Sequence, residues 1–148
     1  MTWKLIEKSI TIDAPAEKVW EVLFTQEINK IWFAEFSEGT QAYTDWRVGS
    51  KAIFKDESES GIIGRITANK LHEELVIEYD GMIMNGKEDF ESKEAKDMKG
   101  VKETYKLVTD GPKTRLDVTV DMDPEYFDMM SEAWDRALDI IKDLAEKR

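Results

Sequence analysis

Residues 123–148 read DPEYFDMMSEAWDRALDIIKDLAEKR and carry the strongest local signal in the chain. Their apolar side chains recur every three or four residues, which places them on one side of an α-helix. Asp123 can cap the first turn and Pro124 suits the first helical position, while basic residues near the end suit the negative end of the helix dipole. We predict a long helix with Asp135 and Asp139 in water and with a buried stripe made of Phe127, Met130, Trp134, Ala137, Leu138, Ile141 and Leu144.

The middle of the chain, from about residue 41 to residue 121, has the sequence pattern of an antiparallel meander. Short β-like runs alternate with glycines and charged clusters, a pattern that does not suit alternating βαβ units. The clearest run alternates Leu116, Val118 and Val120 with polar neighbours, which predicts one dry face and one wet face. One further strand is expected before the meander, at residues 5–13. The strands expected in the meander are residues 42–46, 51–55, 62–71, 74–80, 101–109 and 114–121.

Two short helices are expected between the first strand and this meander. Asp13-Ala14-Pro15 ends the strand, and Pro15 suits the first turn of a helix. Apolar residues recur at helical spacing over residues 19–24, and a second set over residues 28–32 runs into Phe33 and Phe36. This segment holds the richest supply of aromatic side chains in the protein.

Length and composition restrict the class of protein. A chain of 148 residues with 41% hydrophobic residues fits one domain, residues 1–148, with one core. The net charge of −11 repels phosphate backbones and anionic lipid, so we expect neither nucleic acid nor membrane as a partner. Cysteine is absent, and the sequence shows no signal region and no apolar run that could span a bilayer. We therefore expect a soluble, acidic, cytoplasmic protein.

The order of these elements resembles the helix-grip (SRPBCC) superfamily, which includes START domains, birch-pollen-allergen-like proteins and polyketide cyclases. The resemblance is carried by residues 13–20, DAPAEKVW, and by residues 134–142, beginning Trp134-Asp135-Arg136-Ala137-Leu138. It is strongest for the bacterial branch named for homologues of the activator of the heat-shock chaperone ATPase. It implies an α+β fold in which a curved antiparallel sheet of about seven strands grips the last helix. It also implies an apolar cavity between helix and sheet, a kind of site that small ligands prefer.

Catalytic and metal motifs are weak in this sequence. The only histidine, His72, stands beside two glutamates at a strand boundary, and no Gly-x-Ser-x-Gly nucleophile exists. With one histidine and no cysteine, a zinc site would consist almost entirely of carboxylates, which is the wrong ligand chemistry. The acidic residues Glu88, Asp89 and Glu91 lack EF-hand spacing, and Gly61 and Gly64 precede a strand rather than a helix. We expect no catalytic motif, no metal and no cofactor.

Aromatic and methionine side chains are the best candidates for a binding site. For any one of them, packing in the core is the simpler interpretation, but methionines adapt well to variable ligands. The connection over residues 81–100, with its Asn85-Gly86 turn signal, is predicted to be a mobile flap over the site. The predicted pocket residues are Trp32, Phe33, Phe36, Trp46, Phe54, Tyr79, Met82, Met84, Tyr105, Phe127, Met130 and Trp134.

Three functions from different classes are compatible with these observations. The leading hypothesis is a binding module for a small apolar or amphipathic molecule, without catalytic machinery. The alternative is a chaperone-associated or other protein-interaction domain, and the third is a cyclase- or dehydratase-type enzyme using Tyr79, Tyr105 or Glu103. A buried carboxyl group with a raised pKa facing a large pocket would favour the enzyme, whereas a filled pocket beside an exposed apolar patch would favour the interaction domain.

Overall fold

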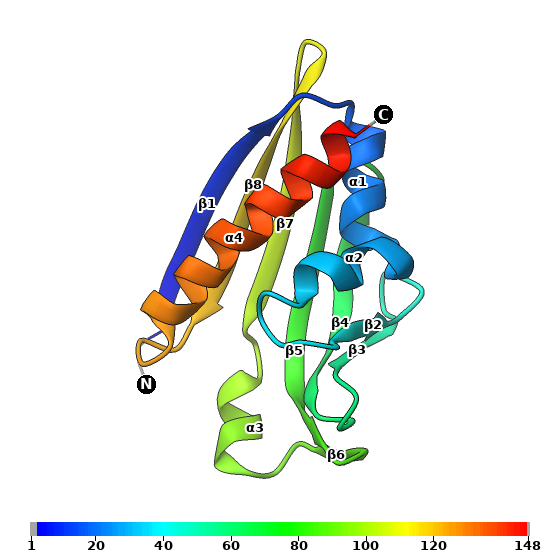
Figure 1. Ribbon diagram of the computed structural model, residues 1–148. Coiled ribbons are helices and arrows are strands. Elements are labelled where there is room, and N and C mark those ends of the chain that lie inside the picture. The colour runs from blue at the N-terminus through cyan, green and yellow to red at the C-terminus, as the bar shows by residue number, and fades with distance from the viewer. Residues whose placement is uncertain (1–2, 148) are drawn as a thin grey trace.

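The computed structural model describes residues 3–147, and within them a curved antiparallel sheet wraps around the last helix (Figure 1). Neighbouring strands follow the order β1-β8-β7-β5-β4-β3-β2, and β6 pairs with β5. The predicted helix-grip fold is confirmed, with β6 as one strand more than the seven expected. The strands are β1 Lys4–Ile12, β2 Gln41–Tyr43, β3 Lys51–Lys55, β4 Gly61–Lys70, β5 Glu74–Met84, β6 Lys87–Asp89, β7 Lys102–Asp110 and β8 Lys113–Met122.

The last helix, α4 (Phe127–Glu146), lies along the inner face of the sheet as its apolar stripe predicted. Its central residues, from Trp134 to Ile141, bury their apolar side, while Asp135 and Asp139 are exposed. The predicted start of the helix was wrong by a few residues. The Oδ1 of Asp123 accepts a hydrogen bond from the backbone N–H of Glu125 at 2.9 Å, which makes a separate turn before the helix. Within residues 3–147 no helix is long and apolar enough to cross a bilayer.

Helices α1 (Ala16–Phe24) and α2 (Gln26–Phe33) cover the same face of the sheet beside α4 (Figure 1). Pro15 is the N-cap of α1 with an extended backbone, one residue before the helical position in the first turn that was predicted for it. The indole N–H of Trp32 donates a hydrogen bond to the carbonyl of Val22 at 3.0 Å and joins the two helices. Both short helices were predicted.

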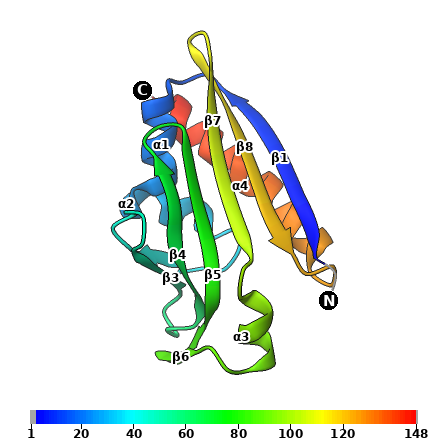
Figure 2. The same ribbon diagram turned by 180° about the vertical axis from the view of Figure 1, so that it is seen from behind.

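The segment between β5 and β7 differs most from the prediction. Strand β5 continues to Met84, and Asn85 and Gly86 turn the chain with positive φ angles of 50° and 79° into β6. Helix α3 (Lys93–Met98) follows, capped by the Ser92 hydroxyl, which accepts a hydrogen bond from the N–H of Ala95 at 3.1 Å. The expected mobile flap is therefore largely regular structure, and Figure 2 shows α3 beside the end of β5 that extends past β7.

A β-bulge at Asp80 determines which side chains of β5 face α4. Two successive residues of β4 pair with Tyr79 and Gly81, which leaves Asp80 as an extra residue in the ladder. Tyr79 and Met82 consequently share the inner face although they are three residues apart, because a bulge shifts the alternation of side chains. Ile83 turns to the opposite face, where it is buried outside the main core.

Candidate functional site

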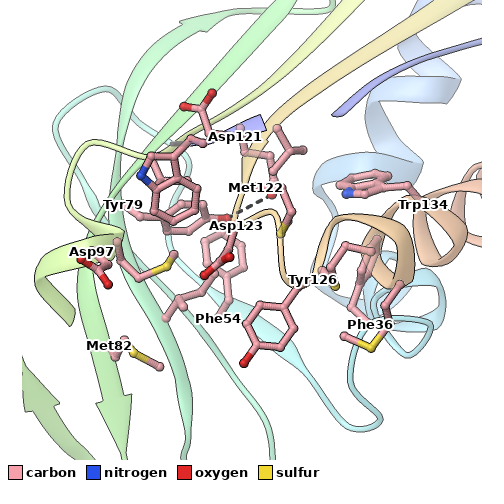
Figure 3. Close-up of a pocket in the computed structure, with 18 of the residues that line it drawn as sticks. Phe36, Phe54, Tyr79, Met82, Asp97, Asp121, Met122, Asp123, Tyr126 and Trp134 are labelled. Atoms are coloured by element: carbon pink, nitrogen blue, oxygen red, sulfur yellow. Dashed lines mark hydrogen bonds between the residues drawn. The ribbon is translucent and has the colours of Figure 1, made fainter. Parts of the chain in front are cut away.

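A cavity of about 650 Å³ lies between the inner face of the sheet and helices α2, α3 and α4 (Figure 3). Most of its wall is aromatic or methionine. Trp134 and Phe36 lie on one side of the view and Met82 on the other, with Phe54 and Tyr79 between them. The volume falls within the range of about 300–1,000 Å³ that is typical of sites for small ligands.

Nine of the twelve predicted pocket residues line this cavity. They are Trp32, Phe33, Phe36, Phe54, Tyr79, Met82, Tyr105, Met130 and Trp134. They meet there because α2 and α4 face the same strands and because the bulge at Asp80 turns Met82 inward. Whether they bind a ligand stays a prediction.

Three predicted pocket residues lie outside the cavity wall. Trp46 adopts a left-handed backbone with φ of 64° and packs its ring against Phe24, at 5.0 Å between ring centroids. Strand β2 ends at Tyr43, earlier than predicted, so Trp46 lies beyond it. Met84 is 51% exposed because it is the last residue of β5, beyond the end of the cavity wall. Phe127 begins α4 beneath the ammonium group of Lys4, which lies 4.5 Å from the ring centroid.

A second set of wall residues is not among the twelve predicted ones, and it forms the end of the cavity near α3 and the β8–α4 turn. Tyr126 and Met129 are 47% and 59% exposed and lie at the opening. Their positions could not be read from helical periodicity, because the turn at Asp123 sets where α4 begins. The other missed wall residues are Trp3, Thr40, Ile62, Lys93, Glu94, Asp97, Met98, Val101, Val120, Asp121, Met122, Asp123 and Glu125.

A carboxyl group and two phenols form the main polar cluster inside the cavity. Glu103 of β7 accepts hydrogen bonds from the hydroxyl groups of Tyr79, at 3.3 Å, and of Tyr105. Burial raises the pKa of Glu103 above its ordinary value, while the two hydrogen bonds oppose part of that rise. Burial and the negative charge of Glu103 raise the pKa of both tyrosines well above the ordinary value. The remaining accessible surface of Glu103 faces the cavity.

This cluster can interact with a ligand in two ways. An ionised carboxylate has about four acceptor positions, so Glu103 can accept a hydrogen bond from a ligand in addition to those from the tyrosines. A carboxyl group whose pKa is raised can also exchange a proton with a bound molecule. Glu103, Tyr79 and Tyr105 are the residues that the sequence nominated for acid–base chemistry.

His72 and the acidic residues Glu88, Asp89 and Glu91 lie outside the cavity wall. His72 occupies the turn between β4 and β5, where its ring lies 6.0 Å from that of Trp20. Glu88 pairs with Lys51, and Asp89 accepts backbone hydrogen bonds from Glu91 and Ser92 at 3.0 Å each. Across residues 3–147 no three or more histidine or acidic side chains are grouped so that they could hold a metal ion.

Comparison with known families identifies the chain. Residues 13–146 match the family described as "Activator of Hsp90 ATPase homolog 1-like protein". The chain belongs to this family. A search of curated proteins gave no match to it.

Several solved structures share the fold of this chain at low sequence identity. The Aha1 dimer from Colwellia psychrerythraea is 18% identical, with a TM-score of 0.73 over 97% of this chain and 96% of that one. Protein MLL2253 from Mesorhizobium loti is 12% identical, with a TM-score of 0.73 over 95% and 96% of the two chains. CalU16 from Micromonospora echinospora is 18% identical, with a TM-score of 0.67 over 97% and 77%. At such identities the likeness establishes the fold alone.

Proposed function

We propose that this protein binds a small amphipathic molecule in the cavity between the sheet and α4. The observation that carries the proposal is an open space of about 650 Å³ whose wall is mainly aromatic and methionine. Burying the apolar part of a ligand there gains about 25 cal/mol for each Å² of apolar surface removed from water. Glu103 supplies a hydrogen-bond acceptor at the inner end for a polar group of the ligand.

The proposal is tested by titration with the neutral fluorescent probe N-phenyl-1-naphthylamine. We expect one saturable site and a higher melting temperature for the complex, because a ligand that binds only the folded state stabilises it. The Met130→Trp variant should fold but lose the site, because the larger side chain projects into the open space. Wild-type protein without saturable binding, together with a Met130→Trp variant destabilised by roughly 1–3 kcal/mol, would mean that this region is solid core.

Acid–base catalysis is a second candidate, and the Tyr79–Glu103–Tyr105 cluster specifically favours it. A carboxyl group with a raised pKa in an apolar cavity suits proton transfer next to a carbonyl group. The test is deuterium exchange into 2-tetralone, followed by NMR in deuterated water. Acceleration by wild-type protein that disappears in Glu103→Gln would support catalysis, and equal rates with and without protein would reject it.

Interaction with a chaperone or another protein is the weaker alternative. The family description motivates it, but the cavity is open rather than filled, which favours a small ligand over a purely structural core. The exposed residues Tyr126 and Met129 border that same opening, so they are also accounted for by ligand binding. A cytoplasmic location stays a prediction from composition.

A further inference from the structure

Charge is distributed unevenly around the cavity. Its wall contains five carboxylates at the end formed by α3 and the β8–α4 turn, namely Glu94, Asp97, Asp121, Asp123 and Glu125. Lys93 is the single basic residue among the described wall residues. Figure 3 shows Asp97 coming from α3 and Asp123 and Tyr126 from the β8–α4 connection.

In the described part of the chain, residues 3–147, these five carboxylates form no ion pairs. Within residues 3–147 none of them lies within 4.0 Å of a charged side-chain nitrogen of lysine or arginine, although ten other ion pairs form. Asp121 accepts a hydrogen bond from the backbone N–H of Lys102 at 3.1 Å, and Asp123 accepts one from the backbone N–H of Glu125 at 2.9 Å. A backbone N–H has no net charge, so these bonds do not cancel the negative charge of the carboxylates. The opening therefore has a negative potential, which the net charge of −11 reinforces.

The interior behind this opening suits the apolar body of a molecule and also suits a cation. Tyr126 exposes its ring at the opening, and Phe36 and Trp134 present theirs farther in. Aromatic faces attract ammonium groups by about 0.5–2 kcal/mol. A fatty acid would instead bring its carboxylate toward five groups of the same charge.

We infer that the cavity selects cationic amphiphiles, namely molecules with an apolar chain and an ammonium group, over neutral or anionic ones. This inference rests on the proposed function, because it specifies the charge of the ligand in the same site. The apolar chain lies among the aromatic side chains, and the ammonium group lies at the opening between Asp97 and Asp123.

The test compares decylamine, 1-decanol and decanoate, which share one chain length and differ in charge. Each is titrated below its micelle concentration against protein loaded with N-phenyl-1-naphthylamine, at pH 7 and low salt. We expect decylamine to displace the probe at a concentration at least about tenfold lower than decanoate, with 1-decanol between them. High salt should reduce the difference in displacing concentration between decylamine and decanoate, because it screens charges near the surface.

Paired variants separate a local effect from the effect of net charge. Asp97→Asn combined with Asp123→Asn should weaken decylamine several-fold and change the affinity for 1-decanol much less. Asp139→Asn combined with Asp143→Asn removes the same charge from the exposed side of α4 and should leave all three affinities unchanged.

The outcomes distinguish this inference from the proposed function. If 1-decanol binds as tightly as decylamine, or if both double variants weaken decylamine equally, the selection for cations is wrong and the apolar site remains. If neither the fluorescent probe nor any of the three chains binds saturably, the proposed function fails as well.

Discussion

Replacing Trp134 by alanine tests the position of α4 directly. The indole is 3% exposed, and its ring centroid lies 4.8 Å from that of Phe36 and 6.1 Å from those of Trp32 and Tyr105. Truncating a buried aromatic residue to alanine costs about 3–5 kcal/mol. The free energy of unfolding should fall by about 3 kcal/mol, the lower end of this range, because one side of the indole already borders the open cavity. The melting temperature should fall by roughly 6–12 °C.

The measurement is urea unfolding followed by far-UV circular dichroism, which does not depend on the fluorescence of the deleted indole. Asp139→Ala is the control, since this exposed residue lies on the same helix and its loss should change the free energy of unfolding by no more than about 0.5 kcal/mol. Equal losses in the two variants would refute the burial of this face of α4.

Other substitutions probe the inner carboxyl group, the bulge and the surface. Because burial raises the pKa of Glu103 in the folded state, its favourable contribution is complete below the unfolded pKa of about 4.5 and is lost as pH rises through the folded pKa. As pH rises from the unfolded to the folded pKa of Glu103, the free energy of unfolding of wild-type protein, measured by urea titration, should therefore fall relative to that of Glu103→Gln. A difference between the two free energies that does not change with pH would contradict the raised pKa. Gly64→Ala should be destabilising by about 1–3 kcal/mol, since a Cβ there would lie 2.6 Å from the carbonyl oxygen of Glu78; an unchanged melting temperature would argue against this register. Arg136→Ala breaks an exposed pair with Glu35 and should cost less than about 1 kcal/mol, decreasing with salt, whereas a larger salt-independent loss would point to a buried role.

The fold could be predicted because its two largest signals are periodic. The stripe on α4 and the alternation in β8 each recur over many residues, so small local irregularities did not obscure them. Single-residue events were harder to anticipate. Strand β2 ends at Tyr43, shortly before the left-handed backbone of Trp46, and α4 begins after a turn in which the Glu125 N–H donates a hydrogen bond to Asp123.

The site was predictable where side-chain chemistry alone carried the signal. Aromatic residues on α2 and α4 had to face the sheet, and the acid–base candidates proved to be neighbours because Tyr105 and Glu103 are two residues apart on β7. The acidic opening was not predictable. Asp97 and Asp123 are distant in sequence, and they meet at one opening because α3 lies beside the free end of β5.

The bulge at Asp80 decides which residues of β5 belong to the cavity wall. Beyond this point, the face on which a β5 residue lies is set by the number of residues before it, whatever its identity. Relatives that lack the extra residue, or place it elsewhere in the strand, would present a different set of side chains to their ligands on an unchanged sheet. The ligand preference of such a cavity can therefore change when one residue is inserted, deleted or moved along β5, because the side chains beyond that position exchange faces.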